Sequence, residues 1–291
     1  MITIENMSYA YDKPLVLDDV NITIEDDVLL GLVGINGAGK STFLRLLSGI
    51  LVPTSGKILI DGAEPSEAST RQNLFLLPDE PYYTSNSTIN SLIKLYKTFH
   101  PDFDENICDE IVNIYGLNKR KKLKDFSKGM RRQAFIALAF GVAPKYIFLD
   151  EAFDGLDPLA RKHFKDYVAK LKREKSMTVV VSSHSLLELD DFCDHFLMID
   201  ATRMSYSNDV ALGQREICKF RIVFQDEVDE SILYRIPFKA LNCKVEGHCI
   251  TATFEGNEEN VLYAINTLNP LVVDKLVANF EDRFISDYGH Q

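Results

Sequence analysis

The feature that most constrains the fold is an eight-residue glycine-rich segment, GINGAGKS, at residues 34–41. An apolar run, VLLGLV, precedes it, and a stretch with helical spacing, STFLRLLSG, overlaps its end and follows it. A strand, a glycine-rich turn and a helix in this order aim successive backbone N–H groups and the positive end of the helix dipole at one anion. The sequence therefore predicts a phosphate-binding loop at the edge of an α/β sheet.

The side chains around this loop suit a nucleotide. Lys40 would reach the β- and γ-phosphates, and Thr42 could add a further phosphate contact. Ser41 would bind Mg²⁺ through its hydroxyl, because Mg²⁺ prefers oxygen ligands. We therefore expect the nucleotide to be bound by Asn36, Gly37, Ala38, Gly39, Lys40, Ser41 and Thr42.

The rest of the chain has a pattern that changes three times. The first thirty residues contain two alternating runs, ITIENMSY and VNITIE, which predict an antiparallel β subdomain. Short apolar runs such as YIFLD and TVVVSS then predict a mostly parallel core sheet buried on both faces. Apolar residues three and four apart predict an inserted helical subdomain at about residues 80–140. Alternating runs near the end predict a small α+β domain at 206–291, after a main domain at 1–205.

Charge and hydropathy exclude several partners. The 291 residues carry a formal net charge of −11, which argues against nucleic acid, because nucleic-acid affinity rests on neutralising phosphates. The basic run at residues 119–122 has no interleaved aromatic residues, so we interpret it as a solvated helix face. The most apolar stretch, residues 134–143, is well short of the roughly 20 residues that cross a bilayer, so no membrane span is predicted.

Cysteine usage and the first residues indicate the compartment. The five cysteines are scattered and lack the CxxC spacing of a zinc site, as in a reducing environment. Cys243 and Cys249 lie near His248, but strands with interior thiols explain this segment better than a metal site. The opening residues lack the basic start and apolar run of a secretory signal, so we expect a cytoplasmic location.

Two adjacent carboxylates form a second candidate site. Asp150 and Glu151 follow the buried run YIFL, and side chains at a strand end point in different directions. Asp150 would hold the water shell of Mg²⁺, whereas Glu151 would point at the γ-phosphate and deprotonate the attacking water. Two solvated acids at a strand end are the alternative, and the nearby phosphate loop favours catalysis.

With these motifs the chain resembles the ABC ATPase family over residues 1–205. That family places ATP between the phosphate loop of one subunit and an LSGGQ signature of another. The corresponding segment here is FSKGM at residues 126–130. Ser127 and Gly129 match the signature and would approach the γ-phosphate at a helix N-terminus, whereas Lys128 and Met130 differ. The resemblance implies a requirement for ATP, Mg²⁺ and a second copy of the chain or a close relative.

Three weaker matches support this resemblance. His184, at the end of TVVVSSH, resembles the switch histidine that bonds the γ-phosphate and orients water, although a lone histidine there is more often structural. The segment at 155–157 resembles the D-loop through which subunits sense each other. Tyr11 resembles the aromatic residue that stacks on adenine, with Tyr9 as its competitor.

The clearest departure from the family is at the Q-loop, where LFLLPDEP places Asp79 at the position of a glutamine. Asp79 could serve as an oxygen ligand of Mg²⁺, and we expect it to couple metal occupancy to movement of the helical subdomain. In the alternative, Asp79 and Glu80 only head that subdomain from solvent.

The resemblance also implies a function. In transporters of this family the helical subdomain docks a coupling helix of an integral membrane permease, which would hold the chain on the inner face of the membrane. The FSKGM and PDEP forms resemble bacterial ABC-2-type exporters of peptides or drugs, including exporters of amphipathic toxins such as phenol-soluble modulins. An importer subunit and a soluble non-transport ABC ATPase are the alternatives. The C-terminal domain could strengthen the dimer or sense a ligand.

Overall fold

The chain divides into two compact units, Met1–Asn208 and Asp209–Gln291. Each unit has a hydrophobic core of its own. The computed structural model describes residues 1–184, 188–189, 192–200, 202–206, 216–278 and 282.

The first unit is organised around a sheet that has six strands in the described part of the chain. Five neighbouring strands run parallel, and the last edge strand is antiparallel. All residues of the central strands β3, β6 and β7 are buried, as expected for parallel strands covered on both faces. In spatial order the strands are β5 (Leu74–Leu77), β6 (Tyr146–Leu149), β7 (Thr178–Ser183), β3 (Leu29–Val33), β8 (His195–Asp200) and β9 (Arg203–Tyr206).

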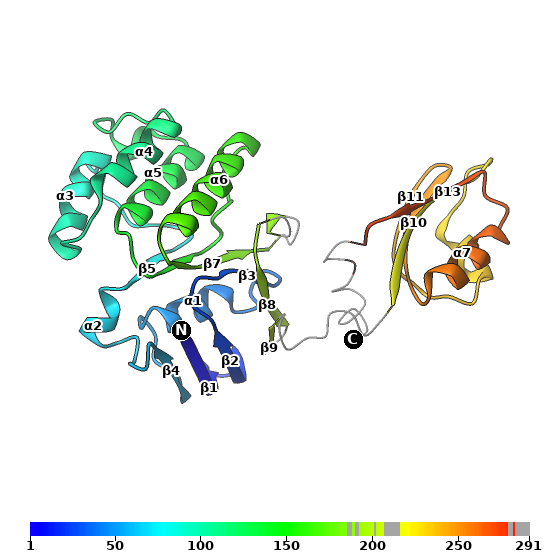
Figure 1. The fold of residues 1–291 in the computed structure, drawn as a ribbon, viewed down its shortest axis with the longest axis horizontal. Helices are drawn as coiled ribbons and strands as arrows, with labels where there is room; N and C mark the ends of the chain where they lie inside the picture. The colour runs from blue at the N-terminus through cyan, green and yellow to red at the C-terminus, as the bar shows by residue number, and fades with distance from the viewer. Residues whose placement is uncertain (185–187, 190–191, 201, 207–215, 279–281, 283–291) are drawn as a thin grey trace. The chain divides into compact units, whose positions relative to one another are not determined.

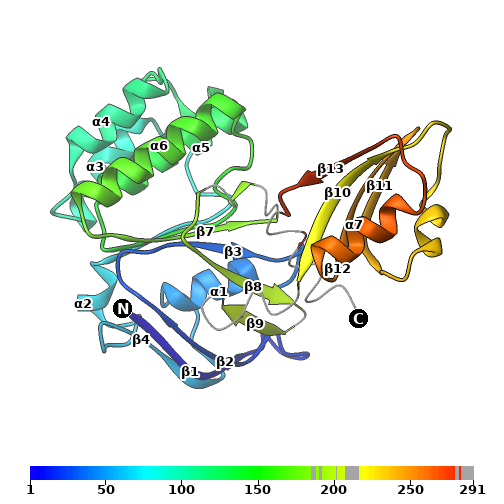
Figure 2. The same ribbon diagram turned by 45° about the vertical axis from the view of Figure 1, so that its right-hand side comes forward.

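A three-stranded antiparallel sheet packs on one side of this parallel sheet, with helix α1 (Lys40–Leu47) between them (Figure 1 and Figure 2). Its strands, in spatial order, are β2 (Leu17–Ile24), β1 (Ile2–Tyr9) and β4 (Ser55–Ile60). The apolar face of β1 and the buried side chains of α1, such as Phe43, belong to one core cluster with β3. This core fixes the start of α1 against the end of β3.

The helical subdomain and α6 cover the other side of the parallel sheet, as both views show. Each long helix begins at a side chain that accepts a hydrogen bond from the first turn: Thr88, Asp104, Ser127 and Asp157. The helices are α3 (Ile89–Phe99), α4 (Glu105–Ile114), α5 (Lys128–Gly141) and α6 (Pro158–Glu174), with the short α2 (Ala68–Arg71) and η1 (Leu123–Asp125). None of the helices in the described ranges combines the length and apolar character needed to cross a bilayer.

The second unit is an antiparallel sheet with strand order β11, β12, β10, β13, whose core includes one face of helix α7. Phe220 and Phe254 on the sheet share this core with Val261 and Ile265 on the helix. The elements are β10 (Ile217–Val223), η3 (Glu230–Arg235), β11 (Ala240–Glu246), β12 (Cys249–Glu255), α7 (Glu258–Asn266) and β13 (Val272–Leu276). The predicted fold class, an α/β core with an antiparallel subdomain, inserted helices and an α+β appendage, is confirmed.

Candidate active site

The glycine-rich loop joins β3 to α1 and has the backbone that its glycines allow. Gly37 and Gly39 have φ values of 85° and 109°, where side chains cause strain. A Cβ on Gly34 would lie 2.8 Å from the carbonyl oxygen of Ile199, so this position also needs glycine. The loop therefore brings backbone N–H groups to the N-terminus of α1, where an anion is stabilised.

Lys40 is the first residue of α1, and its side chain is only 6% exposed. Its ammonium donates hydrogen bonds to the carbonyl oxygens of Gly34 at 2.7 Å and Ile35 at 3.3 Å. The same Nζ lies 3.3 Å from Oε1 of Glu151. The positive charge is thus held inside the phosphate loop and faces the end of β6.

Glu151 connects the phosphate loop to the end of β7. Its other carboxylate oxygen, Oε2, lies 3.0 Å from Nδ1 of His184. The backbone N–H of Glu151 donates to Oγ of Ser182 at 2.8 Å, and that hydroxyl donates to Oδ1 of the buried Asp150 at 2.7 Å. Because β3, β6 and β7 are parallel neighbours, their carboxyl ends meet at one edge, and the structure brings Lys40, Asp150, Glu151 and His184 together there.

Tyr11 approaches the same loop from the antiparallel sheet. Its hydroxyl lies 3.3 Å from Oγ1 of Thr42, and its ring is 55% exposed. Tyr9 is only 8% exposed and packs edge-on against Tyr11, and its burial raises the pKa of its hydroxyl. Of the two rings, Tyr11 is therefore the one with a face open to a base.

The FSKGM segment lies at the start of α5 and contacts the residues that follow Glu151. Ser127 caps the helix by accepting a hydrogen bond from the N–H of Met130 at 3.1 Å. A Cβ on Gly129 would lie 2.3 Å from the carbonyl oxygen of Gly155. Lys128 pairs with Asp154 at 2.6 Å. The structure thus brings the FSKGM segment against the segment that follows Glu151.

Asp79 meets a residue that the sequence did not single out, Arg132 of α5. The Arg132 side chain is 4% exposed, and its Nη2 lies 3.6 Å from Oδ1 of Asp79. Burial raises the pKa of Asp79, and the nearby Arg132 opposes this rise only in part. Arg132 also donates to the carbonyl oxygens of Pro78, Asp150 and Glu151. The sequence feature that could have identified Arg132 is the pair of arginines near the start of α5, just before an apolar run.

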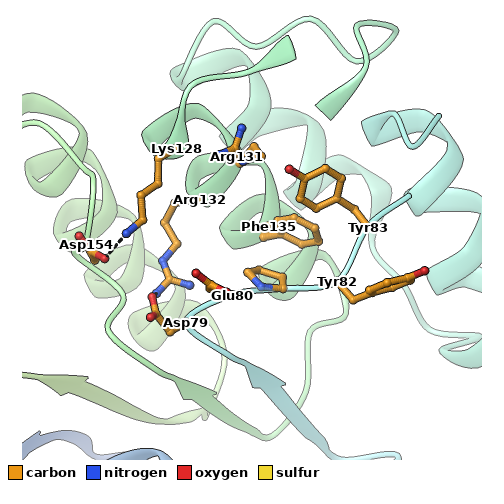
Figure 3. Close-up of a pocket in the computed structure, with 10 residues that line it drawn as sticks. Asp79, Glu80, Tyr82, Tyr83, Lys128, Arg131, Arg132, Phe135 and Asp154 are labelled. Atoms are coloured by element: carbon orange, nitrogen blue, oxygen red, sulfur yellow. Dashed lines mark hydrogen bonds and ion pairs between the residues drawn. The ribbon is translucent and has the colours of Figure 1, made fainter. Parts of the chain in front are cut away.

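A cavity of about 540 Å³ opens beside Asp79 and Arg132. Figure 3 shows Arg132 reaching toward Asp79, with the Lys128–Asp154 pair on one side of the cavity and aromatic side chains on the other. Tyr83 and Phe135 form the aromatic side, with ring centroids 6.3 Å apart. The cavity therefore combines charged and aromatic surface between β5 and α5.

Comparison with known proteins identifies the family. The sequence model described as "ABC transporter" matches residues 17–154. The lantibiotic transport ATP-binding protein SrtF of Streptococcus pyogenes is 32% identical over 196 residues, which are 67% of this chain and 84% of SrtF. The chain belongs to the ABC transporter ATP-binding proteins. The family resemblance seen in the motifs is thereby confirmed, and the chain is an ATPase subunit of a transporter.

Two further comparisons extend the ABC assignment along the chain. The ABC transporter ATP-binding protein YtrB of Bacillus subtilis is 28% identical over 291 residues, covering 99% of this chain and 98% of YtrB. The solved structure of an ATP-binding subunit of an ABC transporter superposes with a TM-score of 0.65 at 25% identity, covering 71% of this chain and 89% of that chain. The likeness to YtrB thus includes the C-terminal unit of this ABC protein.

The protein itself supplies only some of the ligands that Mg²⁺ needs in an ABC ATPase. Ser41 lies in the first turn of α1 and Asp150 at the end of β6, both hard oxygen donors suited to Mg²⁺. Asp79 lies 3.6 Å from Arg132, and Asp150 is among the nearby charges that act on its pKa. Within the described ranges, no three acidic, histidine or cysteine side chains form a metal cluster. Mg²⁺ in such a site depends on nucleotide phosphates and water for its remaining ligands.

Proposed function

We propose that this ABC subunit hydrolyses ATP at composite sites formed with a second copy of itself and thereby powers export of peptides or drugs through a separate permease. The observation that carries the proposal is the position of Glu151, whose two carboxylate oxygens face Lys40 and His184. A general base must lie close to both the γ-phosphate and the attacking water. A carboxylate between a phosphate-binding lysine and a histidine is suited to this task.

Different residues of the site bind the phosphates and activate the attacking water. Lys40 and the loop N–H groups hold the phosphates, with Ser41 and Asp150 available for Mg²⁺, which neutralises charge on the phosphates when bound. Glu151 takes the proton of the attacking water, and His184 holds the carboxylate and contacts the γ-phosphate. Tyr11 stacks on the adenine. Each role is a proposal for the residue that the geometry makes available.

Dimer formation follows from the separation of the two groups of motifs. In the contacts described above, Ser127 bonds to Met130 and Gly129 lies against Gly155. Their helix N-terminus is nonetheless a phosphate-binding feature. A second copy would place this feature over the phosphate loop of the first, so that two ATP molecules are enclosed between the copies.

The permease and the cargo are inferred from the cavity and from the relatives. The cavity at Asp79, Tyr83 and Arg132 offers charged and aromatic surface to a docking segment of an integral membrane partner, on the inner face of the membrane. SrtF is named for lantibiotic transport, and lantibiotics are peptides. We propose peptide export on this basis, with amphipathic peptides such as phenol-soluble modulins as candidates, over import.

Glu151→Gln tests the proposal. We expect the variant to bind ATP but to release phosphate at least about 100-fold more slowly, because a general base contributes about 10²–10⁴-fold. It should also accumulate an ATP-bound dimer, measured by size-exclusion chromatography with light scattering. Glu110→Gln is the matched control. It changes a carboxylate of α4 that pairs with Tyr167 and Lys170 of α6 and has no role in the proposed site. Normal phosphate release from Glu151→Gln would contradict the proposal.

A further inference from the structure

We propose that Arg132 is a positioning residue for Glu151, and that Asp79 links Arg132 to the segment that follows β5. Arg132 would then set the direction of the Glu151 carboxylate by holding the backbone of that residue, without contacting ATP. The inference rests on the proposed role of Glu151 as the general base.

The contacts of Arg132 join three segments that are distant in sequence. From α5 its guanidinium donates to the carbonyl oxygen of Pro78 at 2.8 Å, and to those of Asp150 and Glu151. Arginine has five donors in a rigid planar fork, so it can hold several acceptors in a fixed relation. Because the group is 4% exposed, water cannot readily replace these bonds.

Glu151 needs such support because its backbone is unusual. Its φ is 47°, in the left-handed region that residues other than glycine rarely adopt. Its N–H donates to Oγ of Ser182, and its carbonyl oxygen accepts from Arg132 and, at 3.0 Å, from the N–H of Asp154. Strained backbone persists where its surroundings determine it, and here they also fix where the side chain points. Without Arg132, the backbone of Glu151 would lose one of these three hydrogen bonds, the one made by a charged donor.

Asp79 provides the connection to the cavity. Its carboxylate lies 3.6 Å from the guanidinium and is 45% exposed, so it can meet a docking partner while it faces Arg132. Among the other charged side chains that line the cavity, Lys128 and Asp154 pair with each other at 2.6 Å, and Glu80 and Arg131 lie there as well. A segment that enters the cavity and moves Asp79 would therefore act on Arg132, and through it on Glu151. This route connects permease docking to hydrolysis.

Two single variants of the full chain separate positioning from general stability. Arg132→Gln should lower kcat by about 10- to 100-fold with KM for ATP changed less than about 2-fold, because a misplacement near 1 Å can cost 10²-fold. Asp79→Asn, at a half-exposed site where folding is not at risk, should lower kcat by several-fold with the same KM. Arg71→Gln is the matched control. Arg71 also donates to a backbone carbonyl oxygen, but that oxygen belongs to Gly49, and neither residue is part of the proposed site.

A double-mutant cycle shows whether Arg132 acts through Glu151. Adding Arg132→Gln to Glu151→Gln should change the residual single-turnover rate by less than about 2-fold, because residues that act as a unit are non-additive. A full additional loss in the double variant, a parallel rise in KM, or a parental kcat in Asp79→Asn would overturn the inference. If Glu151→Gln itself turns over normally, the proposed base fails; if only the Arg132 and Asp79 variants behave like the parent, the inference alone fails.

Discussion

The ammonium of Lys40 lies 3.3 Å from a carboxylate oxygen of Glu151, and both side chains are largely buried, at 6% and 17% exposure. This ion pair links the glycine-rich loop directly to the end of β6. A γ-phosphate that binds Lys40 competes with Glu151 for the same cation. Binding of the nucleotide would therefore release the carboxylate of Glu151 for proton transfer.

Lys40→Met should abolish useful ATP binding. The change removes a charged phosphate ligand and leaves the carboxylate of Glu151 without its cation, and loss of one partner of a buried charge pair costs about 2–5 kcal/mol. We expect the Kd for a fluorescent ATP analogue to rise by at least about 30-fold, as the lower end of that range requires. Lys94→Met, at an exposed position of α3, is the control and should bind as the parent does. Parental affinity in Lys40→Met would contradict the assigned phosphate contact.

Tyr11→Ala and Tyr11→Phe should differ in their ATP affinity. Stacking of a base on an aromatic ring contributes about 1–3 kcal/mol, so the alanine variant should bind ATP about 10-fold more weakly. The phenylalanine variant keeps the ring and loses only the hydroxyl contact with Thr42, so its Kd should stay within about 3-fold of the parent. Isothermal titration with ATP measures both, and equal losses would show that the hydroxyl, not the ring, matters.

The choice between Tyr9 and Tyr11 illustrates what sequence patterns leave open. Simple alternation from Ile2 and Ile4 would place Tyr9 on the exposed face of β1. The strand instead contains a register shift between Ile4 and Met7, with Asn6 at φ 47°. Such a bulge moves all later side chains to the opposite face, so that Met7 and Tyr9 are buried. The sequence analysis favours Tyr11, and the bulge explains why Tyr9 is the buried one of the two.

The glycine-rich loop and strand β6 could be predicted because their sequence patterns are local. The sequence of the loop contains glycines, a lysine and the start of a helix in direct succession. The apolar run before Asp150 has the pattern of a buried strand. Arg132 could not be predicted, because its partners come from β5 and β6 and depend on how α5 packs. Asp79 had the same difficulty: its position was clear from the sequence, whereas its cationic neighbour was not.

Asp61 should make the stability of the first unit sensitive to acid. Burial opposes its ionisation, but hydrogen bonds from Lys145, the terminal ammonium and Tyr146 outweigh burial, so the pKa of Asp61 lies below its usual 3.8. A carboxyl group with a depressed folded-state pKa stabilises the fold above its unfolded pKa, and this contribution is lost as the pH falls through the folded value. Asp61→Asn should therefore be less stable than the parent at pH 7.

Urea unfolding monitored by circular dichroism at pH 7, 5 and 3 measures this effect. The difference between Asp61→Asn and the parent should be constant from pH 7 to pH 5 and should shrink below about pH 4, where unfolded aspartates become protonated. Asp102→Asn changes an exposed loop residue and should follow the parent throughout. A difference that grows toward pH 3 has the wrong sign for a depressed pKa and would refute the assignment.

Gly129→Ala should destabilise the fold although alanine favours helices. A Cβ at this position would lie 2.3 Å from the carbonyl oxygen of Gly155, which is backbone and cannot rotate away. Overpacking of this kind costs about 1–3 kcal/mol, whereas alanine in a helix interior gains up to about 1 kcal/mol over glycine. The neighbouring Lys128→Ala removes only an exposed ion pair with Asp154 and should cost less than about 1 kcal/mol. The midpoints of urea unfolding measure both variants. Equal midpoints for Gly129→Ala and Lys128→Ala would mean that the segment at Gly155 shifts to make room for the added methyl group. The close contact between Gly129 and Gly155 would then not stabilise the fold.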